Sequence, residues 1–148
     1  MTIELRPVEG DFERPPSTSH YEDWGPVDPA AAPFPIERWL IVRDGQVVGD
    51  LSAHPVSYGP TAGSVAMNIG ISVVDEHRGQ GIGSAAQRML AELLHERGIV
   101  RIEASTDVEN VPEQRALEKA GFLFEGVARG AQVRADGRHD LQVWSHLP

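Results

Sequence analysis

A glycine-rich segment that leads into an amphipathic helix has the residue types best suited to chemistry. An apolar run ends at Val73-Val74, and the residues that follow are Asp75-Glu76-His77-Arg78-Gly79-Gln80-Gly81-Ile82-Gly83-Ser84. Glycines allow the backbone to approach a ligand closely, and the first amides of a helix have no carbonyl partner within the helix. The helix dipole adds an attraction for negative charge at this end. The segment therefore predicts an anion-binding site, and a phosphorylated cofactor is its natural ligand.

The elements on either side of this segment follow from the spacing of apolar residues. Residues 65–74 are nearly all apolar and predict a central strand that is covered on both faces. Residues 81–97 repeat apolar side chains at intervals of three and four, which predicts a helix. A second helix is expected after Asn110, where Pro112 and Glu113 suit the first turn. Further strands are expected at residues 2–6, 36–43, 46–54, 99–105, 122–128 and 139–147.

The order of these elements predicts a mixed α/β fold of the α+β type. Residues 36–43 and 46–54 are joined by Asp44-Gly45, which is a strong hairpin signal. We therefore expect a mostly antiparallel central sheet flanked by helices, with one parallel step around the long helix. The chain of 148 residues suits a single domain over residues 1–148. Within it, residues 7–35 contain seven prolines, which excludes a long helix and predicts an irregular segment.

Composition and charge exclude several classes of protein. The chain has no cysteine, so disulfides, zinc–thiolate sites and thiol nucleophiles are excluded. Its formal net charge of −9 disfavours nucleic acids and anionic membranes as partners, because both carry negative charge. No apolar run approaches the roughly 20 residues needed to cross a membrane, and the N-terminus lacks the pattern of a signal peptide. We therefore expect a cytoplasmic protein that uses no metal.

Two other phosphate-binding patterns can be compared with the glycine-rich segment. A nucleotide P-loop needs a lysine before its serine or threonine, and none is present here. A dinucleotide-binding fold is the closer competitor, because Gly79-x-Gly81-x-x-Ser84 approaches its fingerprint and Glu103 ends the next strand. That fold turns from strand into helix at once, whereas five residues intervene in this chain, and the preceding strands form a hairpin. An NAD(P)-dependent oxidoreductase is therefore the weaker alternative.

The arrangement Arg78-x-x-Gly81-x-Gly83, after a central strand and at the start of a long helix, closely resembles the acyl-CoA site of the GNAT N-acetyltransferase superfamily. The similarity continues downstream and is closest to the RimJ/RimL-type branch, which acetylates protein N-termini and small amines. The residues that carry it are Asn110, Glu118-Lys119-Ala120-Gly121-Phe122, Glu125-Gly126, Arg129 and Asp140. The resemblance covers roughly residues 36–147. It implies an acyl-CoA-dependent N-acyltransferase in which a splayed central strand binds the cofactor.

The resemblance also assigns the residues that would bind acetyl-CoA, the acyl donor. It implies that the diphosphate lies on the amides of Arg78, Gly79, Gln80, Gly81, Ile82, Gly83 and Ser84. It implies that backbone groups of Ile71, Ser72 and Val73 pair with the pantetheine arm, one amide polarising the thioester carbonyl. Asn110 would contact the arm, although it also suits a helix cap. Lys119 would reach the phosphate edge, although a solvated lysine is the competing interpretation.

The reaction that the resemblance implies is direct attack of a neutral amine on the thioester, which needs a base for the ammonium and an acid for the departing thiolate. The sequence departs from the family here, since Leu117 and Asn68 stand where many relatives carry a tyrosine acid and a glutamate. The base candidates are Glu103, on the strand beside the cofactor, and His54, at the end of a strand facing the same region. A structural role for each is the competing interpretation. A catalytically silent CoA-binding module or sensor is therefore the alternative function.

The acceptor is expected to be an amine-bearing small molecule or a peptide N-terminus. The acidic net charge mildly favours a cationic amine. Residues 7–35, 55–63 and 130–137 are expected to lie on the acceptor side, but they carry no motif that names the acceptor. A homodimer is common among relatives and is kept as an open expectation for this chain.

Overall fold

The strands of the sheet are antiparallel to their neighbours at every step but one. The computed structural model describes residues 1–15, 17–22, 36–59 and 62–148. The strands in these residues are β1 (Ile3–Pro7), β2 (Glu37–Arg43), β3 (Gln46–Ser57), β4 (Val65–Val73), β5 (Ile102–Asp107), β6 (Leu123–Arg134) and β7 (Gly137–His146). Their spatial order is β1-β2-β3-β4-β5-β7-β6, and the single parallel pair is β4 with β5. The expected mixed α/β fold with a mostly antiparallel sheet is therefore confirmed.

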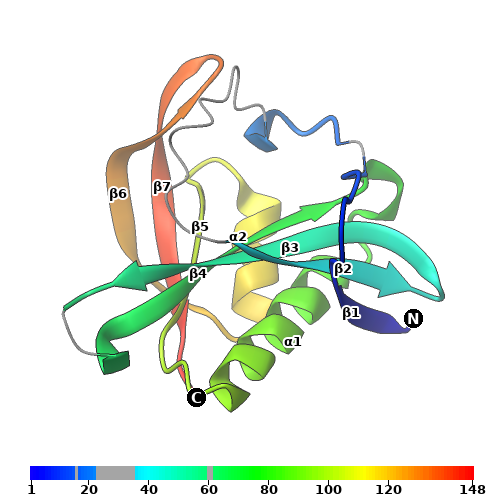
Figure 1. The fold of residues 1–148 in the computed structure, drawn as a ribbon. Coiled ribbons are helices and arrows are strands. Elements are labelled where there is room, and N and C mark those ends of the chain that lie inside the picture. The colour runs from blue at the N-terminus through cyan, green and yellow to red at the C-terminus, as the bar shows by residue number, and fades with distance from the viewer. Residues whose placement is uncertain (16, 23–35, 60–61) are drawn as a thin grey trace.

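Two α-helices in the described residues pack on one face of the sheet (Figure 1). Helix α1 spans Ile82–Glu96 and helix α2 spans Val111–Lys119. Leu90 of α1 and Leu117 of α2 are fully buried in the same core as Ile69 of β4. Short 3₁₀ turns lie at His20–Glu22, Ala62–Ser64 and Asp75–His77. The helices thus seal one face of the sheet and leave the loops at their N-terminal ends near its centre.

Helix α1 forms where the apolar spacing predicts it. Its buried residues Ile82, Ala86, Leu90 and Leu94 recur at every fourth position, so they lie on one side of the helix. Gly98, with a φ of 90°, follows its last turn as expected for a helix stop. The helix therefore lies with its apolar stripe on the sheet and its first turn at the end of β4.

Strands β4 and β5 pair only over a short stretch. Their register joins Met67 with Ile102, Asn68 with Glu103 and Ile69 with Ala104. Beyond this stretch β4 continues along β3 as far as Val73, whereas β5 continues along β7. The two strands therefore separate after Ile69, as the expected splay of the central strand requires.

The hairpins show which strand limits the sequence predicts correctly. Asp44 and Gly45 adopt positive φ angles of 49° and 80° between β2 and β3, as their dipeptide predicts. The strand expected at residues 122–128 is longer than predicted, so its expected end at residue 128 is wrong. Strand β6 continues to Arg134, which pairs with Gly137 at the start of β7. Where the register of that hairpin shifts, the Gly130 amide donates to Asp140 Oδ1 at 2.7 Å. The Asp140 side chain thus takes the place of a backbone partner at this irregularity, which the sequence does not predict.

The fifth strand also starts later than expected. The sequence predicts a strand from residue 99, but β5 begins at Ile102. The Ile99 amide still donates to the carbonyl oxygen of Leu94 at 3.1 Å, so it closes the end of α1. Ile99 therefore closes the C-terminal end of α1 and does not belong to β5.

The proline-rich segment is described only in part, because Pro16 and residues 23–35 lie outside the described residues. The described part contains one 3₁₀ turn, at His20–Glu22, and no longer helix. Ser17 accepts a hydrogen bond from Arg78, and the Tyr21 hydroxyl donates to the carbonyl oxygen of Glu109 at 3.3 Å. Residues 17–22 therefore bridge the loops that follow β4 and β5 (Figure 1).

Candidate active site

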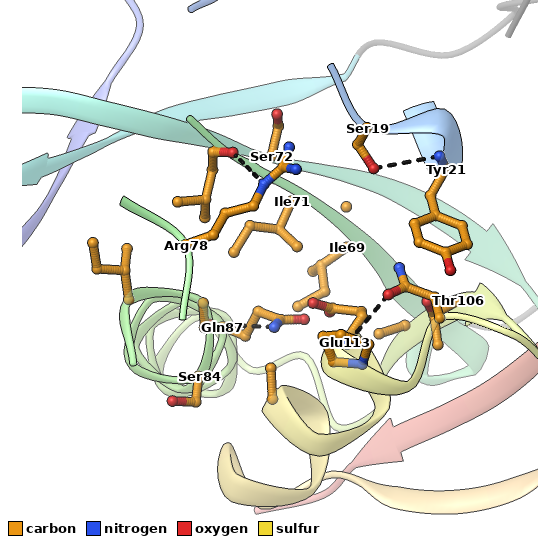
Figure 2. Close-up of a pocket in the computed structure, with 18 of the residues that line it drawn as sticks. Ser19, Tyr21, Ile69, Ile71, Ser72, Arg78, Ser84, Gln87, Thr106 and Glu113 are labelled. Carbon is orange, nitrogen blue, oxygen red and sulfur yellow. Dashed lines mark hydrogen bonds between the residues drawn. The ribbon is translucent and has the colours of Figure 1, made fainter. Parts of the chain in front are cut away.

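A cavity of about 710 Å³ opens where β4 and β5 separate (Figure 2). On the helix side it is enclosed by the loop before α1 and by the first turns of both helices. The residues that line it there include Gly81, Gly83, Gln87, Asn110 and Glu113. On the opposite side the lining includes Arg14, Asp50, Ser52, Ser72 and Asp107.

Strand alternation indicates that this cavity passes through the sheet. Leu51 and Ile69 belong to the core beneath the helices, so the residues next to them along each strand point to the other face. Asp50 and Ser52 flank Leu51 on β3, and Asp50 lies opposite Ser72 on β4. Residues of both faces line the same cavity. The gap between β4 and β5 therefore connects the two faces of the sheet.

The loop between β4 and α1 presents backbone amides to the cavity. Gly79 and Gly81 have φ angles of 72° and 81°, which L side chains rarely adopt. Gly81 is the N-cap of α1 and offers no side chain to accept from the first amides of the helix. The Ser84 hydroxyl does not cap these amides either, since it donates to the carbonyl oxygen of Gly81 at 3.1 Å. This geometry suits an anion at the helix N-terminus.

Arg78 is held at the end of β4 by its own loop and by the N-terminal segment. Its Nε donates to the carbonyl oxygen of Val73 at 3.1 Å, and its Nη2 lies 2.8 Å from Asp75 and 2.7 Å from Ser17. Hydrogen bonds from Thr18 hold the pKa of Asp75 below its usual range, and Arg78 adds to this effect. The Arg78 side chain stays 40% exposed. A guanidinium that is fixed in place and still accessible is suited to bind an anion.

The structure brings all but one of the expected cofactor residues to the cavity wall. The lining residues from that set are Ile71, Ser72, Val73, Arg78, Gly79, Gly81, Ile82, Gly83, Ser84, Asn110 and Lys119. The exception is Gln80, whose side chain contacts Arg43 and donates to the carbonyl oxygen of Glu76 at 3.2 Å. Asn110 is also the N-cap of α2, where its Oδ1 accepts from the Glu113 amide at 3.4 Å.

The two expected base candidates lie elsewhere, since neither Glu103 nor His54 lines the cavity. Glu103 is buried and accepts from Arg101 Nε at 2.7 Å and from the Tyr58 hydroxyl. The hydrogen bond to Glu103 raises the pKa of Tyr58. His54 lies opposite Asn68, which in turn lies opposite Glu103, so both candidates belong to one cross-strand row. That row crosses the paired part of β4 and β5, before the gap opens, and gives the expected base role no geometric support.

Glu113 lines the cavity, although the sequence predicts for it only a place in the first turn of the second helix. The Asn110 amide donates to the carbonyl oxygen of Asp107 at 2.9 Å, so the Glu113 carboxylate is not needed to cap it. Burial raises the pKa of Glu113 to about 7, and a hydrogen bond with Gln87 opposes part of that rise. One available signal was its spacing from Leu117, which is fully buried one helical turn later. Residues four positions apart share a helix face, so an inward carboxylate is expected there.

The wall on the opposite face holds two buried carboxylates, each beside an arginine. Asp50 accepts from Arg14 Nε at 2.9 Å. Asp107 forms an ion pair with the buried Arg134, and it lies 2.8 Å from His139 Nδ1. Because both carboxylates are paired, this wall is polar and fixed in shape.

Two further classes of feature are absent from the part of the chain that the structure describes. No group of three or more histidine and carboxylate side chains there is arranged to hold a metal ion. None of the helices there has both the length and the apolar character required to cross a membrane.

The fold and the site agree with a known class of protein. Residues 2–122 match the acetyltransferase (GNAT) family, and the chain belongs to this family. Among its relatives, it is 34% identical to the probable N-acetyltransferase YjcK of Bacillus subtilis over 87 residues, 58% of this chain and 46% of that protein. It is 31% identical to the L-amino acid N-acetyltransferase AaaT of Escherichia coli over 100 residues, 67% of this chain and 60% of that protein.

Solved structures give the same result for the fold. RimJ of Mycobacterium smegmatis, in complex with CoA-disulfide, superposes with a TM-score of 0.67 at 27% identity, covering 76% of this chain and 53% of that one. The chain also spans less than two thirds of the length of each of the two relatives above. The comparisons therefore establish the family and the fold.

Proposed function

We propose that this protein transfers an acetyl group from acetyl-CoA to the primary amine of a small molecule or a peptide N-terminus. The observation that carries the proposal is the cavity that passes between β4 and β5 from one face of the sheet to the other. A thioester held on the helix side and an amine entering from the opposite face would meet in this gap. Holding two reactants in this way can lower the barrier by about 7–11 kcal/mol.

The cofactor diphosphate is proposed to lie on the amides of residues 78–84. Support comes from the positive φ angles of Gly79 and Gly81 and from the side-chain-free N-cap of α1. Amides with no side-chain cap and the positive end of the helix dipole both favour a doubly charged group. The guanidinium of Arg78 would add a charge-assisted hydrogen bond at the same place.

The pantetheine arm is proposed to follow the free side of β4. Strand β5 stops pairing with β4 after Ile69, while β3 stays paired with it as far as Val73. Backbone groups of residues 71–73 that face the gap thus lack a strand partner and can pair with the amide groups of the arm. An amide near Ile71 would then polarise the thioester carbonyl as the amine attacks.

The acceptor wall supports an amine that carries further polar groups. It presents carboxylates and guanidiniums side by side, with Asp50 beside Arg14 and Asp107 beside Arg134. The α-amino group of an amino acid or a peptide N-terminus brings such polar neighbours with it. The name of the relative AaaT describes an enzyme that acetylates L-amino acids, which supports this class of acceptor.

We further propose that the enzyme works in the cytoplasm, and we retain a homodimer as its assembly. The cytoplasm is supported by the absence of cysteine from the whole chain. The assembly can be measured by light scattering of the purified protein.

The test of the cofactor site uses Gly83, which lies on the cavity wall. A Cβ at this position would lie 3.9 Å from Ala116 and Ile71, so a small side chain fits but an indole must fill the cavity. We expect Gly83→Trp to weaken CoA binding by at least about tenfold, or about 1.4 kcal/mol, in calorimetry. Glu92→Trp, at an exposed position of the same helix, is the matched control and should bind CoA normally.

Catalysis is tested with acetyl-CoA and a panel of amino acids, amines and N-terminal peptides, by measuring release of the CoA thiol. Turnover that Gly83→Trp abolishes and Glu92→Trp preserves would support the proposal. CoA binding without turnover across the panel would instead support the silent CoA-binding module. Equal CoA affinity of Gly83→Trp and the wild type would show that the cofactor lies elsewhere.

A further inference from the structure

The departing thiolate of CoA needs a proton, and the structure offers one acid on the helix side of the cavity. Three carboxylates line the cavity in the described residues: Asp50, Asp107 and Glu113. Asp50 and Asp107 lie on the opposite wall, and each is paired with an arginine. Glu113 extends from the first turn of α2 toward the gap, on the same side as the loop before α1 (Figure 2).

The Glu113 carboxyl lies near the side chain of Gln87, which is 1% exposed. The Gln87 amide nitrogen donates to the carbonyl oxygen of Gly83 at 3.2 Å, which anchors this side chain to the first turn of α1. The Gln87 side chain also interacts with the Glu113 carboxyl and holds its pKa below the value that burial alone would give. Gln87 therefore lies close to both Glu113 and the backbone of the first turn of α1.

The charges around Glu113 do not favour its ionised form. The other ionisable groups on the cavity wall are His77 and Arg78 before α1, Tyr21 and Arg14 of the N-terminal segment, Arg38 of β2, Asp50 of β3, Asp107 of β5, and Arg115 and Lys119 of α2. No described cation lies within ion-pair distance of Glu113, and Arg78 is engaged by Asp75. Only burial and the hydrogen bond with Gln87 shift the pKa of Glu113, and burial is the larger effect.

Two observations indicate that this carboxyl can donate a proton near neutral pH. Its pKa is raised to about 7, so near neutral pH a large share of the molecules carry the proton. Leu117, one turn later on the same helix face, is fully buried, so this face of α2 points into the protein. Burial disfavours the ionised form, so the carboxyl keeps its proton until a stronger base, such as a thiolate, is formed beside it.

We propose that the Glu113 carboxylic acid is the catalytic acid that protonates the sulfur of CoA as the thioester is cleaved. The inference rests on the proposed acetyl transfer. The nitrogen lone pair forms the C–N bond at the carbonyl carbon, the C–S bond breaks, and its electron pair moves to sulfur. The Glu113 proton moves to that sulfur and yields the free CoA thiol. The amine nitrogen loses one proton to water, and water returns one to Glu113.

The kinetic test compares Glu113→Gln with the wild type in acetyl transfer. We expect kcat to fall by about 10²-fold, as for the loss of a general acid, while the affinity for CoA changes by less than about threefold. The wild-type kcat should decline as the pH rises through the pKa of Glu113, because only the protonated form is active. Glu113→Gln should lack this decline, and Glu113→Asp should restore part of kcat together with it. Glu118→Gln, at an exposed position of the same helix, is the matched control.

A second measurement needs no turnover. The ultraviolet absorbance of the thiolate reports the pKa of the thiol of bound CoA. If Glu113 lies beside the sulfur, its carboxylate raises the thiol pKa by like-charge repulsion, so Glu113→Gln should lower the thiol pKa and Glu118→Gln should not.

These outcomes distinguish failure of the proposed role of Glu113 from failure of the proposed acetyl transfer. A wild type that binds CoA and acetylates no amine overturns the acetyl transfer itself. If the wild type is active and Glu113→Gln has the same kcat and pH profile, only the proposal that Glu113 is the catalytic acid is overturned. An unchanged thiol pKa in that variant places the sulfur elsewhere and also overturns the acid. Loss of CoA affinity in step with kcat, at an unaltered pH profile, would assign Glu113 a structural role.

Discussion

At the residue scale, Glu113 illustrates how burial changes the chemistry of a common side chain. A surface glutamate is ionised at neutral pH, whereas burial raises the pKa of Glu113 to about 7. Gln87 supplies a hydrogen bond but no positive charge, so it offsets only part of the effect of burial. The folded protein therefore holds a proton that the unfolded chain releases in weak acid.

This proton makes the stability of the protein depend on pH. Below the unfolded pKa of about 4.3 both states bind the proton and Glu113 has no effect, but above it folding must retain a proton that the unfolded chain has lost. The free energy of unfolding is therefore expected to fall by up to about 3 kcal/mol as the pH rises through the window between the two pKa values. Above that window the folded protein carries a half-buried carboxylate whose ionised form is costly.

The measurement is urea unfolding of the wild type and Glu113→Gln without CoA. The two proteins should differ little near about pH 4, and Glu113→Gln should be the more stable at about pH 8. A constant difference over that range would contradict the raised pKa. Glu118→Gln, which is exposed, should follow the wild type throughout.

At the element scale, one cluster of charged side chains joins strands on the face away from the helices. Arg101, just before β5, binds Glu103 of β5 at 2.7 Å and Glu125 of β6 at 2.9 Å. Ser145 of β7 donates to Glu125 at 3.0 Å, and Tyr58, just after β3, donates to Glu103. The cluster therefore connects elements from both sides of the point where β4 and β5 pair.

Arg101→Ala should destabilise the protein by about 3 kcal/mol, because it leaves Glu103 buried without its cation. The Glu103 side chain is only 6% exposed, so water cannot replace the guanidinium. Arg97→Ala is the matched control, since its pair with Glu37 is about half exposed on both sides. In urea unfolding, Arg97→Ala should lower the free energy of unfolding by less than about 1 kcal/mol. An equal loss of stability in Arg101→Ala and Arg97→Ala would show that burial does not strengthen the ion pairs of the Arg101 cluster.

The elements also show what could be predicted from the sequence. The glycine loop, α1 and the first hairpin depend on local spacing and turn chemistry, so the prediction places them correctly. The faces of Glu103 and His54 depend on strand register and on where β4 and β5 part, which no local pattern encodes. The sequence predicts Glu113 in the first turn of the second helix, whereas its cavity-facing side chain depends on the packing of α2 against α1. Long-range packing thus determines the part of the site that the sequence does not predict.

At the scale of the whole molecule, the gap between β4 and β5 would give the two substrates of the proposed reaction separate routes. Most of the residues proposed to bind the cofactor lie on the helix side, whereas Asp50 and Ser52 line the cavity from the opposite face. Neither substrate needs to leave before the other enters, so both can be bound at once.

This arrangement predicts sequential kinetics rather than a substituted-enzyme mechanism. Initial rates measured over a grid of acetyl-CoA and amine concentrations should give intersecting double-reciprocal plots. The protein has no cysteine to carry an acetyl group, which agrees with direct transfer. Parallel plots, together with an acetylated protein detected by mass spectrometry, would contradict the expectation.

A sheet that is open between two strands also constrains any molecule that occupies both sides of it. A conjugate joining CoA to its acceptor would be threaded through the gap, with a bulky group on each face. To dissociate, it must draw one of these groups back between β4 and β5, or those strands must move apart. Such inhibitors should therefore leave slowly, and their residence time would report how readily the centre of the sheet opens.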